Sequence, residues 1–186
     1  MKVIGVAGMP GSGKSVVSRI AAKMGYKTIR MGDVIRDEAQ KQGKDVGEVA
    51  VNLRVEYGEN IVAERCVEKI KKISKEVPPK SSNTNDKFII EGIRSPFEVE
   101  VFKNNFKGFN VVAIYSTPKT RFKRLKRRKR SDDSINHEDF IKRDKRELGF
   151  GIGDVIATSD YMIVNEGPLW KYKKALNNVF KRFSKR

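Results

Sequence analysis

The stretch Gly8-Met9-Pro10-Gly11-Ser12-Gly13-Lys14-Ser15 decides the fold, because it fits the eight-position phosphate-binding pattern G-x-x-x-x-G-K-[ST]. Glycines in such a loop let successive backbone N–H groups turn inward around a phosphate, and the helix that follows directs its partly positive N-terminus at the same anion. In this pattern the Lys14 ammonium reaches the β- and γ-phosphates, and the Ser15 hydroxyl takes a place on Mg²⁺. We therefore predict that residues 8–15 bind a nucleoside triphosphate and its Mg²⁺, with ATP as the expected cofactor.

The residues around this loop supply the context that the pattern requires. An apolar run at 3–7 predicts a buried strand before the loop, and residues 16–22 open a helix after it. Further apolar runs are found at 27–31, 88–93, 111–115 and 161–164, separated by stretches with helical spacing. Strands that alternate with helices favour a parallel sheet covered on both faces. The fold class predicted is α/β: a P-loop NTPase of three layers, α/β/α, with a five-stranded parallel sheet.

The remaining segments are predicted to be excursions from a single domain that spans residues 1–186. Residues 34–76 carry two amphipathic stripes separated near Gly58, and residues 119–150 form a basic flap. Residues 78–86 have the composition of an exposed loop, and we assign no chemistry to them. Gly149 to Gly153 contains a G-x-G pattern that follows no strand, which indicates a tight connection rather than a dinucleotide site.

Composition limits the class of protein. The formal net charge is +17, and such a field attracts polyanions, so nucleic acid is an alternative partner that the charge alone does not favour over nucleotides. No stretch approaches the roughly 20 apolar residues needed to cross a bilayer, so no membrane partner is expected and a cytoplasmic location is. One cysteine, Cys66, and one histidine, His137, offer neither an internal disulfide nor a usual zinc set.

Two basic segments have a helical pattern with different expected roles. The C-terminal one has apolar residues at helical spacing that predict a core-facing stripe: Leu169, Tyr172, Leu176, Val179, Phe180 and Phe183. Its charged side is interpreted as a solvated face. The apolar residues Phe97, Val101, Phe102 and Phe106 are likewise assigned to core packing. The other basic segment, 119–130, is a candidate for phosphate contacts.

Ligands of such sheets bind at the carboxyl ends of the strands, which directs attention to Asp33, Glu91, Arg94, Asn165 and Gly167. Either Asp33 or Glu91 is predicted to hold Mg²⁺ through water or to poise the attacking oxygen. A second interpretation of Asp33 is that it caps the following helix. A buried Glu91 requires a cation, which is Mg²⁺ or an arginine.

The segment from Gly32 to Arg36 resembles the Gly-Asp-x-x-Arg segment of nucleoside monophosphate kinases of the adenylate kinase type, which clamps the phosphate of the acceptor. Glu91-Gly92-Ile93-Arg94 is similar to their Asp-Gly-x-Pro-Arg segment, although Glu replaces Asp and the arginine comes one position early without the proline. The resemblance implies that Arg36 and Arg94 hold an acceptor and that residues 34–76 are a helical acceptor-binding insertion.

The basic stretch 124–133 resembles the short lid of the same superfamily. There, lid arginines close over the transferring phosphates, expel water and stabilise negative charge in the transition state. The resemblance implies such roles for Arg124 and Arg128, which share one helix face, with Arg130 and Arg143 as further phosphate contacts. A solvated basic helix is the alternative interpretation.

The segment 160–169 resembles the last strand and following turn of dephospho-coenzyme A kinases, where the turn lies near adenine. This implies that Asn165 and Gly167 contact the nucleotide, and that Asp33 is a general base toward a hydroxyl. The His-Pro pair of those enzymes is missing, because His137 precedes Glu138. Over its whole length the chain is similar to an uncharacterised archaeal family of adenylate-kinase-related P-loop proteins, through Leu53-Arg54-x-Glu56-x-Gly58 and residues 144–151.

Three functions are consistent with these patterns. The leading one is a kinase that transfers the γ-phosphate of ATP to a small nucleotide-like acceptor. The second is phosphorylation of a hydroxyl on a nucleotide-like cofactor, as in dephospho-coenzyme A kinases. The third is a nucleotide-dependent switch ATPase that associates with RNA or ribosomes, suggested by the basic charge. Arg54 and Arg65, in the acceptor-side flap, are additional candidates for substrate contact.

Overall fold

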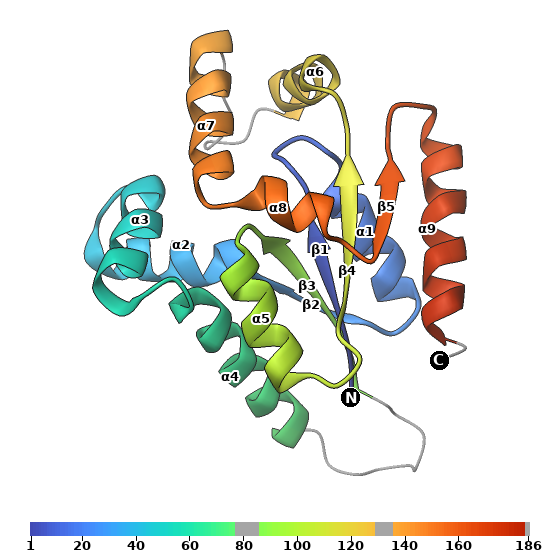
Figure 1. The fold of residues 1–186 in the computed structure, drawn as a ribbon, viewed down its shortest axis with the longest axis horizontal. Helices are drawn as coiled ribbons and strands as arrows, with labels where there is room; N and C mark the ends of the chain where they lie inside the picture. Colours follow the sequence, from blue (N-terminus) through green and yellow to red (C-terminus); the bar gives the residue numbers. More distant parts are fainter. Residues whose placement is uncertain (77–85, 129–135, 185–186) are drawn as a thin grey trace.

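A computed structural model describes residues 1–76, 86–128 and 136–184, and these form a parallel sheet between two layers of helices (Figure 1). The strands are β1 (Lys2–Ala7), β2 (Lys27–Arg30), β3 (Lys87–Ile93), β4 (Asn110–Tyr115) and β5 (Tyr161–Val164). All neighbouring pairs are parallel, in the order β2-β3-β1-β4-β5. The five strands coincide with the five apolar runs, so the predicted sheet is confirmed.

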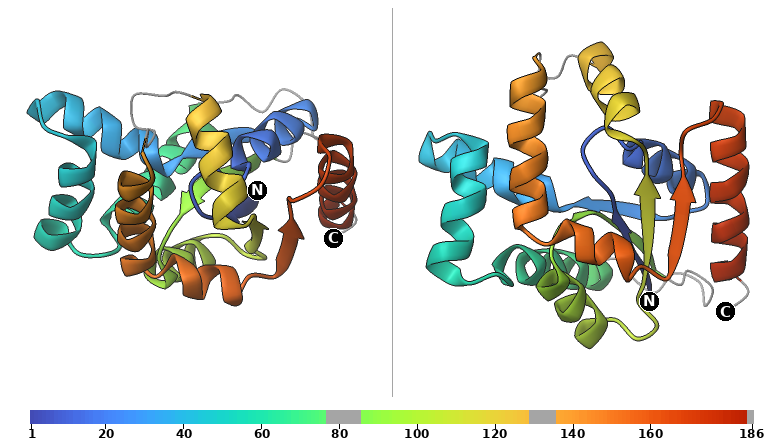
Figure 2. Two further views of the ribbon diagram at one scale, coloured as in Figure 1. Left: turned by 90° about the horizontal axis from the view of Figure 1, so that it is seen from above. Right: turned by 45° about the horizontal axis from the view of Figure 1, so that its top comes forward.

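The helices cover both faces of the sheet (Figures 1 and 2). Their bounds are α1 (Lys14–Lys23), α2 (Met31–Gln42), α3 (Val46–Tyr57), α4 (Ile61–Glu76), α5 (Pro96–Asn105), α6 (Pro118–Arg128), α7 (His137–Gly149), α8 (Ile152–Ala157) and α9 (Leu169–Ser184). Buried residues of α1 and α9 pack on one face of the sheet, and those of α2 to α5 and α8 pack on the other. The three-layer α/β/α fold follows, as predicted.

Strand alternation explains why the sheet has two cores. On β1, Val3 belongs to the core under α2 to α5, whereas Ile4 and Val6 belong to the core under α1 and α9. On β4, Val111 and Val112 divide in the same way. The central strands are therefore buried on both faces. Because all the strands are parallel, their carboxyl ends lie along the same edge of the sheet, which is where ligands of such sheets bind.

The two excursions occupy definite places beside this sheet. Residues 34–76 comprise most of α2 together with α3 and α4, and Gly58, with φ 89°, ends α3 as the predicted break. Helices α6 and α7 extend beyond the carboxyl ends of the strands (Figure 1). Gly151, with φ 91°, separates α7 from α8, which is the predicted tight connection. Of the predicted loop at 78–86, only Asp86 lies among the described residues, and Arg130 lies outside them.

Two apolar positions contradict the predicted core. Leu169 is 52% exposed and Phe97 is 58% exposed, although the other members of their stripes are buried or partly buried. Both residues lie in the first turn of a helix, Leu169 in α9 and Phe97 in α5. Helical spacing identifies the face of a helix but not how far the neighbouring layer reaches.

Burial keeps the lone thiol, that of Cys66, in its protonated form. The surrounding core raises the pKa of Cys66 to about 12, so this thiol stays protonated at neutral pH. Within the described ranges, the helices are too short or too polar to span a bilayer.

Candidate functional site

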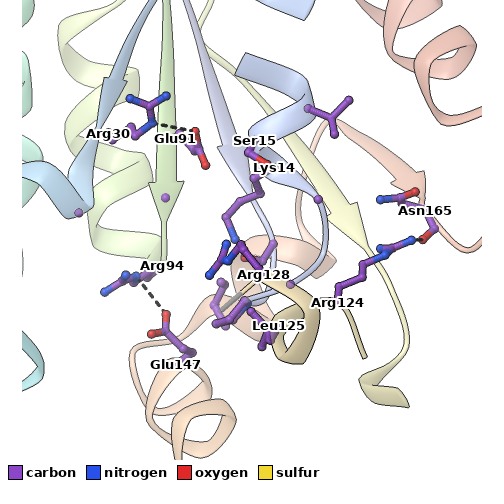
Figure 3. A pocket seen from close by; sticks show the side chains of 18 of the residues that line it. Lys14, Ser15, Arg30, Glu91, Arg94, Arg124, Leu125, Arg128, Glu147 and Asn165 are labelled. Atoms are coloured by element: carbon purple, nitrogen blue, oxygen red, sulfur yellow. Dashed lines mark hydrogen bonds and ion pairs between the residues drawn. The ribbon is translucent and has the colours of Figure 1, made fainter. Parts of the chain in front are cut away.

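A cavity of about 480 Å³ opens at the carboxyl ends of the strands, between the phosphate-binding loop, α2 and the helices α6 and α7 (Figure 3). Most of the predicted site residues line it: Gly8, Pro10, Gly11, Gly13, Lys14, Ser15, Arg36, Glu91, Arg94, Arg124, Arg128, Arg143, Asn165 and Gly167. Met9, Ser12 and Asp33 do not line it. The fold therefore gathers side chains from widely separated parts of the sequence around Lys14.

The loop is held by a set of contacts to its carbonyl groups. Asn165 Nδ2 donates to the Ser12 carbonyl at 2.8 Å, and the Tyr172 hydroxyl donates to the Gly13 carbonyl at 3.1 Å. Burial raises the pKa of Tyr172, which keeps that hydroxyl a donor. Gly13 has φ 108°, and a Cβ there would lie 2.4 Å from Asn165 Nδ2, so only glycine fits. Asn165 thus supports the loop in addition to lining the cavity.

The N-terminus of α1 has the features of an anion site. No side chain caps it and no acidic residue lies in its first turn. Its first N–H groups therefore lack a side-chain acceptor from the chain, and they carry the positive end of the helix dipole. The exposed Ser15 lies in this turn and lines the cavity. This geometry suits a phosphate group above the loop.

The Lys14 ammonium donates hydrogen bonds to the first residues of its own loop. Its Nζ donates to the carbonyl oxygens of Gly8 and, at 3.2 Å, of Met9. Burial lowers the pKa of Lys14 from 10.5 to about 8, and the nearby carboxylates of Glu91 and Glu147 oppose this effect. The ammonium is therefore poorly solvated where it lines the cavity, and a bound anion would stabilise its charge.

A pH dependence of ATP binding follows from this pKa. Because the predicted ATP site requires the ammonium form, we expect the Kd of ATP to be flat near pH 7 and to rise about tenfold by pH 9, where about nine tenths of a group of pKa 8 is neutral. Calorimetry of Mg·ATP binding measures this, and above pH 8 binding should take up protons. Lys14→Arg is the control, since a guanidinium keeps its charge and should flatten the profile. An equal fall in both proteins would contradict the assignment to Lys14.

Glu91 is the carboxylate that faces the cavity beside the loop. Its Oε2 accepts from the Ser18 hydroxyl at 2.7 Å and lies 3.5 Å from Arg30 Nε (Figure 3). The cation expected beside Glu91 is thus an arginine, Arg30. The sequence did not indicate Arg30, because it ends a strand and belongs to no motif. Among the described residues, no three His, Cys, Asp or Glu side chains cluster as a metal site. One carboxylate and one hydroxyl, Glu91 and Ser15, fit Mg²⁺ that is bound mainly by nucleotide phosphates.

Asp33 takes part in an ion pair instead of facing the cavity. It lies in the first turn of α2 and accepts from Arg36 Nη2 one turn later. The helix has no side-chain cap, so the interpretation of Asp33 as a cap is wrong. Arg36 itself lines the cavity. Asp33 thereby orients this arginine.

Arg94 is paired with a carboxylate that sequence reasoning did not assign. Its Nε lies 3.0 Å from Glu147 Oε2, which is contributed by α7 (Figure 3). The Glu147 side chain is only 3% exposed, yet it lines the cavity. This pair connects the end of β3 with the lid region. The stretch 144–151 contained Glu147, but nothing in one sequence shows that it meets Arg94.

Two arginines of α6 donate hydrogen bonds to carbonyl groups of the phosphate-binding loop. Arg124 donates to the Ser116 hydroxyl at 2.9 Å and to the Asn165 carbonyl at 2.9 Å, so it joins the ends of β4 and β5 (Figure 3). The buried Arg121, also missed in the sequence, donates to the Pro10 carbonyl at 3.3 Å and to both Asp144 oxygens at 2.8 and 2.5 Å. The first turns of α6 are therefore anchored, and Arg128 lies nearer the end of the helix.

Arg54 and Arg65 do not line the cavity. Arg54 is buried, with Nη2 2.8 Å from Glu98 Oε1 and its guanidinium over the Phe150 ring at 4.6 Å. Arg65 pairs with Glu38 at 3.3 Å. The structure gives both residues contacts within the protein, in place of the substrate contacts considered from sequence.

Comparison with known proteins places the chain in a family. Residues 4–147 match a family model described as an AAA domain (AAA_18). A UPF0200 protein of Methanothermobacter thermautotrophicus is 58% identical over 186 residues, which cover 100% of this chain and 93% of that protein. The chain belongs to the UPF0200 family. The resemblance to an archaeal P-loop family is thereby confirmed.

Solved structures similar to this UPF0200 chain include two named kinases. TT1252 from Thermus thermophilus has a TM-score of 0.64 at 17% identity and covers 97% of both chains. A shikimate kinase from Acinetobacter baumannii has a TM-score of 0.59 at 15% identity, covering 100% of this chain and 94% of that one. A gluconokinase from Sinorhizobium meliloti has a TM-score of 0.61 at 15% identity, covering 99% and 94%. At these identities the likeness shows the P-loop kinase-like fold.

Proposed function

We propose that this protein is an ATP-dependent phosphotransferase whose acceptor is a small nucleotide-like molecule that carries an anionic group. One observation carries the proposal: cations surround Lys14 within a single cavity. Two carboxylates and seven cations line it, namely Glu91 and Glu147 against Lys14, Arg30, Arg36, Arg94, Arg124, Arg128 and Arg143. Such an excess suits two phosphorylated ligands side by side, the donor and the acceptor.

The arrangement of the cavity residues supports a separate side for each ligand. The triphosphate lies on the loop and the α1 N-terminus, with the nucleoside toward Asn165, Gly167 and Leu169 at the other end of the cavity. The acceptor lies toward Arg36 and Arg94, at the ends of β2 and β3. The two ligands then meet near Lys14.

Phosphoryl transfer requires alignment and neutralisation of charge more than covalent participation of the protein. Arg128 and Arg143 line the cavity from α6 and α7, where they are suited to stabilise charge on the migrating group and to exclude water. Mg²⁺ would be held by Ser15 and, through water, by Glu91, and it supplies further neutralisation of the phosphates. Lys14 orients the transferred group.

Asp33 bears on whether the accepting oxygen belongs to a phosphate or to a hydroxyl, because only a hydroxyl needs a general base. A general base must reach the proton that it abstracts. Asp33 does not line the cavity and is neutralised by Arg36. The same pair presents a guanidinium to the acceptor side, which suits the phosphate of a nucleoside monophosphate as the accepting group.

An acceptor screen tests the proposal. ADP release from Mg·ATP is measured with nucleoside monophosphates, dephospho-coenzyme A, shikimate, gluconate and RNA supplied separately. Stimulation by a nucleoside monophosphate is the expected result. Stimulation only by dephospho-coenzyme A, shikimate or gluconate, each of which offers a hydroxyl, would replace a nucleotide phosphate as the accepting group. Stimulation only by RNA would favour the switch ATPase.

Arg36→Ala separates the acceptor side from the donor side. We expect the KM of the acceptor to rise by about 10- to 100-fold, as for the loss of a hydrogen bond to a charged group, with the Kd of Mg·ATP within about twofold of wild type. Steady-state kinetics and calorimetry measure the two quantities. Lys41→Ala is the matched control, because Lys41 lies on the same helix, is 74% exposed and does not line the cavity. A parallel loss of ATP affinity would show that Arg36 belongs to the donor site.

A further inference from the structure

The acidic residues of this chain are confined to its middle. All 23 carboxylates lie between Asp33 and Glu166. Residues 1–32 contain six Lys and Arg residues and residues 167–186 contain seven, with no Asp or Glu in either segment. Most of the net charge of +17 therefore comes from the two ends of the sequence.

The fold brings these two ends together. Helix α1 from the first segment and α9 from the second pack against each other on one face of the sheet (Figures 1 and 2). Apart from Lys171, which lies beside Trp170, the exposed cations of the two helices are Arg19, Lys23, Lys173, Lys174, Lys181 and Arg182. We name this surface the α1/α9 face. It joins two single-sign segments that are separated in sequence by residues 33–166.

The cations of the α1/α9 face differ from those on the other side of the sheet. Among residues 1–76, 86–128 and 136–184, no carboxylate forms an ion pair with the six cations of this face. On α2, α4 and α5, by contrast, Lys41 and Arg65 pair with Glu38, and Lys103 pairs with Glu100. A solvated helix commonly mixes both signs, whereas an uncompensated field of one sign attracts a polyanion.

The outer side of α9 has further groups suited to a nucleic acid. Lys174, Asn178 and Arg182 follow one another at intervals of four residues and are exposed, opposite the buried Leu176 and Phe180. Such a row offers two cations for phosphates with an amide between them. No apolar side chain interrupts these three positions, which disfavours insertion into a lipid surface.

An exposed aromatic ring stands at the start of the same helix. Trp170 is 61% exposed, and Lys171 Nζ lies 5.7 Å from the centre of its ring. Its neighbour Leu169 lines the nucleotide cavity. The cationic row of α9 therefore continues to an exposed aromatic ring that is adjacent in sequence to a residue of the cavity wall. Cations that follow a backbone, together with an aromatic ring for a base, are the elements of single-strand recognition.

We propose that the α1/α9 face binds single-stranded RNA. Phosphates contact the cations of α1 and α9, an unpaired base stacks on Trp170, and Asn178 contacts a ribose 2′-hydroxyl, which distinguishes RNA from DNA. This interaction is independent of phosphoryl transfer, since the cations of the face do not line the cavity.

Charge reversal with a matched control tests the proposal. Fluorescence anisotropy of a labelled oligouridine is measured between ~50 and ~200 mM salt with wild type, with Lys173→Glu/Lys174→Glu/Lys181→Glu, and with Lys69→Glu/Lys75→Glu/Lys107→Glu. The control lysines are exposed on the opposite side of the sheet, and the change in net charge is identical. We expect the α9 variant to lose at least about tenfold in affinity and about 2 in the slope of log K against log salt, at ~0.7 per phosphate contact.

A second variant and a second probe complete the design. Trp170→Ala should weaken RNA binding about tenfold with little change in salt slope, because stacking is not ionic. Calorimetry of Mg·ATP should give the wild-type Kd for the α9 variant, so a failure of this proposal is distinct from a failure of the phosphotransferase proposal. Equal losses in the two triple variants would overturn the proposal, as would equal binding of oligodeoxyuridine or preferential binding of anionic vesicles.

Discussion

Replacing Lys14 by alanine is expected to lower ATP turnover by about two to three orders of magnitude, the range found when one preorganised donor is removed from a transition state. The physical reason is the position of its ammonium, which rests on the Gly8 and Met9 carbonyls at the wall of the cavity. No other side chain supplies a cation on the loop itself, residues 8–15. ADP release under the acceptor-stimulated conditions and calorimetry of Mg·ATP measure the loss.

The control is Lys23→Ala, which removes an exposed lysine from the last turn of the same helix. It should leave ATP binding unchanged. Because burial lowers the pKa of Lys14 to about 8, its charge is unfavourable in the folded protein below that pH. Lys14→Ala should therefore leave the Tm unchanged or raise it. Full ATP uptake by Lys14→Ala would exclude the loop as the triphosphate site.

The sheet and the phosphate-binding loop were predictable because both are local patterns. Each strand is an apolar run of a few residues bounded by polar or turn residues, and the loop is one uninterrupted motif. The strand-end rule then selected Glu91, Arg94 and Asn165, and the structure brings all three to the cavity. These predictions did not require knowing which distant segments of the chain contact each other.

The unpredicted features depend on pairs that are far apart in sequence. Glu147 meets Arg94 across 53 positions, and Asp144 meets Arg121 across 23. A basic helix does not show which of its arginines turn inward, so Arg121 was indistinguishable from its neighbours. Leu169 was assigned to the core by its spacing, and only the arrangement of layers shows that it faces the cavity.

Asp33 illustrates a different limit. Its position after β2 was predicted, but the direction of its side chain depends on Arg36, three residues later. Either residue of such a pair can turn toward a ligand while the other orients it. Sequence position selects the pair, and tertiary packing decides which member lines the cavity.

Glu98→Ala is expected to lower the free energy of unfolding by about 3–5 kcal/mol, the usual cost of removing one partner from a buried ion pair. Glu98 is fully buried, and its Oε1 lies 2.8 Å from Nη2 of the buried Arg54. Its Oε2 accepts from the backbone N–H groups of Arg94 at 2.8 Å and Ser95 at 3.3 Å, as part of the capping box of α5. The variant loses this cap and leaves a buried guanidinium without its main partner.

For a chain of this length the loss corresponds to a fall in Tm of roughly 10 °C or more, measured by calorimetry or circular dichroism. Glu100→Ala is the control, because Glu100 lies on the same helix, is 66% exposed and pairs with Lys103 at 3.8 Å; its Tm should change by little. Equal Tm values for the two variants would contradict the argument.

The double variant Arg54→Met/Glu98→Ala divides the effect into its two parts. Removing the orphaned cation should recover part of the lost stability, since an apolar side chain carries no desolvation penalty there. What remains lost is the contribution of the cap, which fixes the backbone of Arg94 at the edge of the cavity. If Arg94 holds the phosphoryl acceptor, the KM of that substrate should stay elevated in the double variant even where Tm recovers. The reason is that the backbone N–H of Arg94 still lacks the Glu98 carboxylate to which it donates.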